Sequence, residues 1–289
     1  MLKQATKQFL KDIYYIRNKP SFMILGAQKS ATSTLYKLLI QHPEIIAPVT
    51  DKEIGFFNNE IAYHKGIKQY HKHFPKTRER HHTFDATPEY FYMPACAERI
   101  YKYNKNLKFI LLLREPVERA YSAWNMYRHL IDEDYNYLMT RLENTEKHTN
   151  ITHLINLLKR TPFPAFEEFI EEEQKIIENT PNIMFPGLIR YGFYDEQLER
   201  YFNFFDKKQF LIVGYKEFTN DPKLTVAKII RFLNIKEVAD YYDQLNLTPV
   251  NKRDYKEKIN ASIQASLSEI FIPHNDNLRR LIENDNFNF

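Results

Sequence analysis

The chain alternates short, fully apolar runs with stretches in which apolar residues recur at helical spacing. Residues 22–25 form an apolar run of strand length, and the leucines within 35–39 then follow the helical period, so a helix is predicted to begin near Thr32. Residues 107–113 and 210–214 are two further runs typical of buried strands. This order of strands and helices indicates an α/β fold.

Weaker patterns predict further elements. A short amphipathic helix is predicted over residues 1–18, a strand over 45–49, and helices over 150–160 and 164–178. Asp221 followed by Pro222 gives an N-cap and a first-turn proline, so a helix is predicted from there to Leu233. The three consecutive glutamates at 171–173 are interpreted as a solvated face.

Composition narrows the class of protein. No linker, repeat or low-complexity tract divides the 289 residues, so a single domain over residues 1–289 is predicted. The 41 basic and 37 acidic residues give a net charge of only +4, which does not indicate general nucleic-acid binding. Cys96 is the only cysteine, which excludes an intramolecular disulfide and a cysteine-based metal site. No segment has the length of a transmembrane helix and the N-terminus lacks an apolar signal core, so a cytoplasmic protein is expected.

The turn between the first strand and the first helix carries a lysine and several hydroxyls: Lys29, Ser30, Thr32, Ser33 and Thr34. The first N–H groups of a helix point at an anion placed there, and the helix dipole favours negative charge. The pattern differs from the loop of nucleoside triphosphatases, because no second glycine precedes the lysine. The turn therefore predicts a phosphate site, and an ordinary strand-to-helix connection with a capping hydroxyl is the alternative.

The same stretch, Gly-Ala-Gln-Lys-Ser-Ala-Thr-Ser-Thr-Leu at residues 26–35, resembles the 5′-phosphosulfate loop of sulfotransferases, closest to the heparan sulfate N- and 3-O-sulfotransferase branch. Those enzymes use 3′-phosphoadenosine 5′-phosphosulfate (PAPS). The resemblance implies a P-loop-like three-layer fold, with a central parallel sheet flanked by helices. It also implies that the donor is held by Lys29, Ser30, Ala31, Thr32, Ser33 and Thr34. Ala31 stands where the branch usually has glycine, and its methyl group would crowd the phosphate if the backbone there needs a positive φ.

A second segment, Lys-Glu-Ile-Gly-Phe-Phe at residues 52–57, resembles the family's Lys-Glu-x-x-Phe-Phe, whose glutamate is the general base. By resemblance Glu53 is the base, Lys29 assists catalysis, and Lys52 contacts the phosphosulfate. A base is needed because a neutral hydroxyl or a protonated amine is a poor nucleophile until its proton leaves. The alternative is a strand end that lies over the core.

The segment at residues 83–91 resembles the family's Glu-Lys-Ser/Thr-Pro-x-Tyr-Phe, which lines the acceptor cleft. Thr87 and Tyr90 are the candidate acceptor residues, whereas Ala86 replaces the family's lysine. The basic, histidine-rich stretch at 64–82 would steer an anionic acceptor or form a solvated face. Its histidines show no clean zinc-ligand spacing.

The segment from Arg114 to Ser122 matches the family's 3′-phosphate motif, Arg-x-Pro-x-x-Arg-Ala-Tyr-Ser. By resemblance Arg114 and Ser122 bind the 3′-phosphate, and arginine suits this role because its planar fork binds phosphate oxygens in pairs. A structural ion pair of Arg114 is the alternative.

Three further segments continue the resemblance toward the C-terminus. Residues 187–198 resemble a segment near the cofactor, in which Arg190 or Tyr194 would contact nucleotide or acceptor, with core packing the equal alternative for Tyr194. Lys252 and Arg253 are the candidates for a basic loop that closes over PAPS, although no glycine follows Gly214. Residues 271–278 resemble the family's terminal Phe-x-Pro-His-Asn-x-x-Leu.

Together these motifs predict a PAPS-dependent sulfotransferase whose acceptor is a hydroxyl or amine of a saccharide. No metal is required, since lysine and arginine can supply the positive charge that magnesium gives in kinases. Two alternatives stay open. One is an atypical P-loop kinase, and the other is a nucleotide- or glycan-binding protein with a decayed site, for which Ala31 and Ala86 are the support.

Overall fold

A computed structural model describes residues 15–289 except 51, 144–150, 181–183, 186, 251–254 and 256–257. Its centre is a four-stranded sheet in which every neighbouring pair is parallel. Across the sheet the strands are β4 (Phe84–Asp85), β2 (Phe22–Gly26), β5 (Lys108–Leu113) and β6 (Phe210–Gly214). The three apolar runs of the sequence are therefore confirmed as neighbouring strands.

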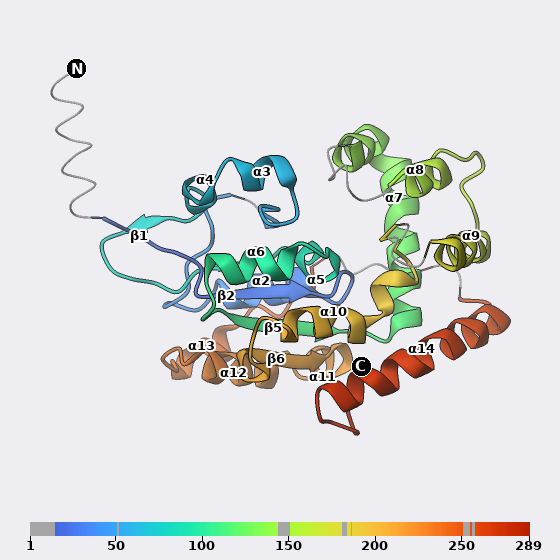
Figure 1. The fold of residues 1–289 in the computed structure, drawn as a ribbon. Coiled ribbons are helices and arrows are strands. Elements are labelled where there is room, and N and C mark those ends of the chain that lie inside the picture. Colours follow the sequence, from blue (N-terminus) through green and yellow to red (C-terminus); the bar gives the residue numbers. More distant parts are fainter. Residues whose placement is uncertain are drawn as a thin grey trace, which may run out of the picture.

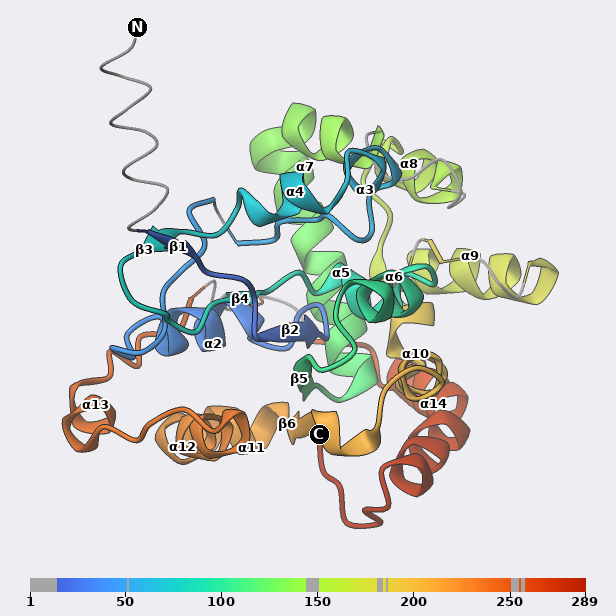
Figure 2. The same ribbon diagram turned by 60° about the vertical axis from the view of Figure 1, so that its left-hand side comes forward.

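The sheet lies between two helical layers (Figures 1 and 2). Successive side chains of a strand point to opposite faces, so Phe109 and Leu111 join one apolar core while Ile110 and Leu112 join the other. The first face is covered by α5 (Glu89–Tyr92), α6 (Cys96–Tyr103) and α10 (Tyr194–Phe202). The second is covered by α2 (Thr32–Leu39), α12 (Pro222–Leu233) and α13 (Ala239–Gln244). Burial of each of these large apolar side chains is worth about 1.5–3 kcal/mol, and the predicted three-layer α/β fold is confirmed.

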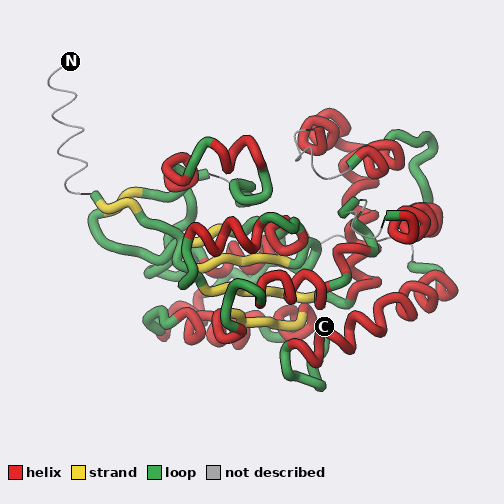
Figure 3. Tube along the Cα trace, viewed as in Figure 1, coloured by secondary structure: helices red, strands yellow, loops and turns green. Residues whose placement is uncertain are grey.

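The other elements surround this body, as the secondary-structure colouring of Figure 3 shows. A small antiparallel sheet pairs β1 (Ile16–Arg17) with β3 (Lys76–Thr77). The remaining α-helices are α3 (Glu60–His64), α4 (Ile67–His71), α7 (Pro116–Glu143), α8 (Thr152–Leu158), α9 (Phe166–Asn179), α11 (Tyr215–Asn220) and α14 (Ala261–Leu281). Two 3₁₀ turns span Arg190–Gly192 and Lys207–Gln209.

Several predicted elements are found and two are not. Helices α8, α9 and α12 occupy the stretches predicted to be helical. The helix predicted over 1–18 falls mostly outside the described residues, and at Ile16–Arg17 the chain is a strand, because Arg17 and Asn18 bond to the segment at Phe74–Thr77. The strand predicted over 45–49 is reduced to one bridge between Ile45 and His82. Pro48 has no N–H to continue a ladder there.

The interpretation of residues 171–173 as a solvated face is wrong for Glu173, which is buried. Its carboxylate accepts hydrogen bonds from the backbone N–H groups of Gly187, Leu188, Ile189 and Arg190, at 2.7–3.1 Å. Burial raises the pKa of Glu173, and these hydrogen bonds oppose the rise. The loop that leads into α10 is thereby fixed from inside the protein.

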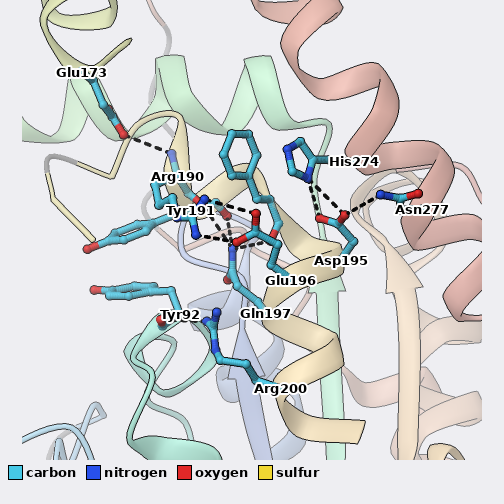
Figure 4. Close-up of polar contacts among 11 residues, drawn as sticks. Tyr92, Glu173, Arg190, Tyr191, Asp195, Glu196, Gln197, Arg200, His274 and Asn277 are labelled. Carbon is cyan, nitrogen blue, oxygen red and sulfur yellow. Dashed lines mark hydrogen bonds and ion pairs between the residues drawn. The ribbon is translucent and has the colours of Figure 1, made fainter. Parts of the chain in front are cut away.

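The C-terminal motif packs α14 against α10 (Figure 4). His274 Nδ1 lies 2.9 Å from Asp195 Oδ1, and Asn277 Nδ2 donates to Asp195 Oδ2 at 3.2 Å. The His274 ring also stacks on Phe193, with 3.8 Å between ring centroids. In this structure the histidine of the motif and Asn277, at a variable position of it, hold α14 in place.

Candidate active site

Three segments meet at one edge of the sheet. They are the loop that follows β2, Arg114 directly after β5, and the segment of Lys52 and Glu53. Arg114 Nη1 donates to the backbone carbonyl of Lys29 at 3.4 Å. Lys52 Nζ lies 3.4 Å from Thr32 Oγ1 and 3.3 Å from Glu53 Oε1. This is the carboxyl-end edge, where open α/β sheets bind ligands. Three motifs that are distant in the sequence are thus brought together.

The loop between β2 and α2 has the features of an anion site. Ala31 is the residue before α2, and no side chain caps the start of this helix. Ser30 is fully buried, and within the described part of the chain its hydroxyl has no hydrogen-bond partner. An uncapped helix N-terminus beside a buried, unsatisfied hydroxyl suits an anionic group that accepts hydrogen bonds. The alternative of a connection capped by a side chain is not what the structure shows.

The other hydroxyls of this helix start have different surroundings. Thr32 and Thr34 are buried, whereas Ser33 is half-buried. Thr34 Oγ1 accepts a hydrogen bond from the N–H of Val250 at 3.1 Å, which connects the helix start to the segment before α14. Of the four predicted hydroxyl contacts, that of Thr34 therefore already has a structural role.

Ala31 has φ +62° and ψ +22°, the left-handed conformation that favours glycine. We expect Ala31→Gly to stabilise the protein by about 1 kcal/mol, because an L residue in this conformation is strained. The melting temperature should then rise by about 2–4 °C. Ala62→Gly within α3 is the matched control and should destabilise instead, because that position is helical. A lower melting temperature for Ala31→Gly would contradict the strain.

The candidate base, Glu53, lies on a tightly turned segment. Glu53 has φ +71° and Gly55 has φ +66°. The Glu53 side chain is 32% exposed and that of its ion-pair partner Lys52 is 16% exposed. The carboxylate is therefore accessible to a reactant while the ammonium is mostly enclosed.

Thr87 and Tyr90 lie behind this segment instead of on an open surface. Both side chains are buried. Thr87 Oγ1 accepts from the N–H of Gly55 at 3.3 Å, and Tyr90 Oη accepts from the N–H of Phe56 at 2.9 Å. Their placement supports the Glu53 segment, and direct contact with an acceptor stays a prediction.

Arg114 and Ser122 flank the start of α7. The Arg114 guanidinium is held by Glu118, with 3.2 Å from Nε to Oε2, and lies 4.7 Å from the Tyr215 ring centroid. Ser122 is buried and its hydroxyl lies 2.7 Å from Tyr255 Oη. Sequence reasoning missed Tyr255, although it is the only aromatic residue between Tyr242 and Phe271. Lys252 and Arg253, predicted to cover the nucleotide, lie outside the described residues.

A profile of the sulfotransferase domain matches residues 19–270. This chain belongs to the sulfotransferase family. It is 27% identical over 239 residues to human heparan sulfate glucosamine 3-O-sulfotransferase 5. The aligned region covers 83% of this chain and 60% of that protein. It is 26% identical over 237 residues to the mouse bifunctional heparan sulfate N-deacetylase/N-sulfotransferase 4, covering 80% of this chain and 24% of that protein. The chain thus spans less than two thirds of the length of these relatives, and the predicted closeness to the heparan sulfate branch is confirmed.

Solved structures agree on the fold of this sulfotransferase. The sulfotransferase of Alicyclobacillus acidocaldarius superposes with a TM-score of 0.65 at 25% identity, over 92% of this chain and 97% of that chain. Mouse sulfotransferase SULT7A1, solved in complex with PAP, superposes with a TM-score of 0.50 at 15% identity, over 91% of this chain and 87% of that chain. The second similarity concerns the fold alone.

The remaining candidates of the sulfotransferase site are Arg190, which Figure 4 shows, and Tyr194. Arg190 faces Glu196 of α10, with 3.2 Å between Nη1 and Oε1, and its side chain is 14% exposed. Tyr194 is buried and its hydroxyl donates to the backbone carbonyl of Arg114 at 2.8 Å. Tyr194 therefore packs in the core and supports the residue predicted to bind the 3′-phosphate.

The described residues of this sulfotransferase show neither a metal-binding cluster nor a membrane-spanning helix. No group of three or more histidine, cysteine, aspartate or glutamate side chains in this part of the chain is arranged to hold a metal ion. In the histidine-rich stretch, burial lowers the pKa of His71, His73 and His82. Among the described helices, none combines the length and apolarity needed to cross a membrane.

Proposed function

We propose that this sulfotransferase transfers the sulfuryl group of PAPS to a hydroxyl or amine of a saccharide. The contact between Arg114 and the carbonyl of Lys29 carries the proposal, because it places two anion-binding features beside each other. One is the uncapped start of α2, and the other is the Arg114 guanidinium at the end of β5. Two such features suit a donor that carries phosphate groups on both its 5′ and 3′ positions. The heparan sulfate sulfotransferases among the relatives support a saccharide acceptor.

The residues of this site fit the donor. The buried, unpartnered hydroxyl of Ser30 and the N–H groups at the start of α2 would hold the 5′-phosphosulfate, and Arg114 with Ser122 would hold the 3′-phosphate. Lys29 and Lys52 supply positive charge where negative charge develops on the oxygen that leaves the sulfuryl group. PAPS supplies an activated sulfuryl group, so the protein needs only to orient it and to stabilise charge.

Glu53 would take the proton of the acceptor. Its carboxylate is partly exposed and bonded to Lys52, which also reaches Thr32 at the start of α2. The base is thereby tied to the donor-binding helix, so proton removal occurs beside the sulfuryl group. As the acceptor oxygen or nitrogen forms its bond to sulfur, the bond from sulfur to the 5′-phosphate oxygen breaks and the proton moves to Glu53.

Calorimetric titration with 3′-phosphoadenosine 5′-phosphate (PAP), beside ATP with magnesium, tests the donor. We expect PAP to bind and ATP with magnesium to bind far more weakly. Turnover with PAPS and heparan sulfate then tests the acceptor class. A preference for ATP with magnesium would contradict the proposal and favour a kinase, whereas PAP binding without transfer to any saccharide would favour a decayed site.

A further inference from the structure

Asp85 is a buried carboxylate at the end of β4, next to the site but not in it. It is fully buried and accepts three hydrogen bonds from hydroxyl groups. Thr87 Oγ1 donates to Oδ1 at 2.7 Å, while Tyr90 Oη and Tyr70 Oη donate to Oδ2 at 2.9 and 3.0 Å. A buried carboxylate is costly unless it is satisfied in this way, so the three hydroxyl donors offset the cost of burying Asp85.

Two of the three hydroxyls connect Asp85 to the segment that carries Glu53. The N–H of Gly55 donates to Thr87 Oγ1, and the N–H of Phe56 donates to Tyr90 Oη. Each hydroxyl has one proton to donate, and here it donates that proton in a hydrogen bond to the carboxylate, because ionised Asp85 can only accept hydrogen bonds. The hydroxyl oxygens are therefore turned toward the two amides as acceptors. Asp85 thus orients the two hydroxyls that accept the hydrogen bonds of residues 55 and 56.

We propose that Asp85 is a positioning residue for Glu53, acting through two hydroxyl relays, Thr87 to Gly55 and Tyr90 to Phe56. The inference rests on the proposed function, in which Glu53 takes the acceptor proton. The relays hold a backbone that would otherwise relax, since Glu53 has φ +71° and only glycine adopts such values without strain. A small displacement of a reacting group can cost about 10²-fold in rate.

The charge of Asp85 makes the relays sensitive to pH. Burial raises the pKa of Asp85 to about 6, the three hydroxyl donors oppose the rise, and the nearby Glu53 carboxylate adds to it. The other titratable groups that face Asp85 are the phenols of Tyr70, Tyr90 and Tyr103. A protonated Asp85 carries an O–H of its own, so its hydroxyl partners must reorient and the two relays are held less firmly.

Stability and turnover should then depend on pH in opposite directions. The pKa of Asp85 in the folded protein lies above its ordinary value of 3.8, so its contribution to stability is complete below about pH 4 and is lost as the pH rises through about 6. Turnover instead should rise over the upper part of this interval, because the relays need the ionised form. A purely structural carboxylate would not connect the two profiles.

The test compares three variants of the relays with one matched control. Asp85→Asn, Tyr90→Phe and Thr87→Val each break a relay, and Thr87→Ser keeps the hydroxyl. Tyr70→Phe removes a hydrogen bond to Asp85 of nearly the same length but none to residues 53–56, and it keeps the ring stacked on Phe56. The readouts are amide hydrogen exchange at Gly55 and Phe56, kcat and KM with PAPS and heparan sulfate, and calorimetric affinity for PAP.

We expect Asp85→Asn, Tyr90→Phe and Thr87→Val to lower kcat at least tenfold and to speed exchange at the amide whose relay is broken, with PAP affinity within twofold. Thr87→Ser should restore most of the rate lost in Thr87→Val. Tyr70→Phe should keep the plateau rate within threefold but move the fall of turnover to higher pH, because a charged carboxylate with fewer donors has a higher pKa.

The inference is overturned if Asp85→Asn keeps its rate and its slow exchange, or if Tyr70→Phe lowers kcat as much as Tyr90→Phe does. A failure of the proposed sulfotransferase function gives a different result from a failure of the role of Asp85. A wild-type protein that neither binds PAP nor transfers sulfate refutes that function, and the exchange pattern of the same variants then decides alone whether Asp85 holds the segment.

Discussion

Replacing Glu53 by glutamine is expected to lower the rate of sulfuryl transfer by a factor of about 10²–10⁴, the usual contribution of a general base. Glutamine has nearly the same shape as glutamate but cannot take a proton from the acceptor. The donor site does not include this carboxylate, so affinity for PAP should stay within about twofold. The measurement pairs steady-state rates on heparan sulfate with calorimetric titration of PAP.

A matched control separates this effect from a general loss of charge. Glu237→Gln, in the segment after α12, removes an exposed carboxylate that lies 2.7 Å from Arg231 Nε, and it should leave both rate and affinity unchanged. If Glu53→Gln kept the full rate, another group would have to accept the proton. If it instead lost PAP affinity, the carboxylate would be acting through Lys52 and not as a base.

Replacing Arg114 by alanine is expected to weaken PAP binding by roughly 30- to 1,000-fold. Two charge-assisted hydrogen bonds to a phosphate are together worth about 2–4 kcal/mol. The guanidinium is already oriented by Glu118, by the ring of Tyr215 and by the carbonyl of Lys29, so little ordering is needed when the phosphate binds. Calorimetric titration of the variant with PAP gives the loss directly.

The alternative, a purely structural Arg114, makes a different prediction. An ion pair with Glu118, whose side chain is 43% exposed, contributes at most about 1 kcal/mol to stability. In that case Arg114→Ala would lower the melting temperature slightly and leave PAP affinity unchanged. Arg114→Lys is the informative companion, because it keeps the charge and loses the planar fork. Intermediate affinity for that variant would identify paired phosphate contacts.

The parts of the fold that could be predicted from the sequence are those decided by local patterns. Residues 22–25 and 107–113 are apolar without interruption, and only strands buried on both faces need such runs. The N-cap of α12 was equally readable, because Asp221 is followed by the proline that begins the helix. The motifs at Lys29, Glu53 and Arg114 were located by resemblance, and the structure brings their segments together.

What sequence reasoning missed depends on contacts between distant segments. Glu173 sits in a run of glutamates that reads as solvated, and only the folded loop of residues 187–190 supplies its four N–H donors. The partner of Ser122 is Tyr255, far along the chain. Asp85 was part of a recognised segment, yet its role depends on hydroxyls from α4 and α5 and on a loop that precedes both. The predicted cytoplasmic location and the single domain stay predictions.

The order of the strands separates the groups proposed to bind the donor from part of the chain that can vary. Strands β2 and β5 are neighbours in the sheet and carry the donor-binding groups at their ends, although α3–α6 lie between them in the sequence, and α7–α10 follow β5 before β6. The first crossover carries Glu53 and Asp85, whereas α8 in the second crossover carries none of the residues assigned to the donor or the base. A segment such as α8 can therefore change, and with it the surface offered to an acceptor, while the strand ends that would hold the nucleotide stay the same.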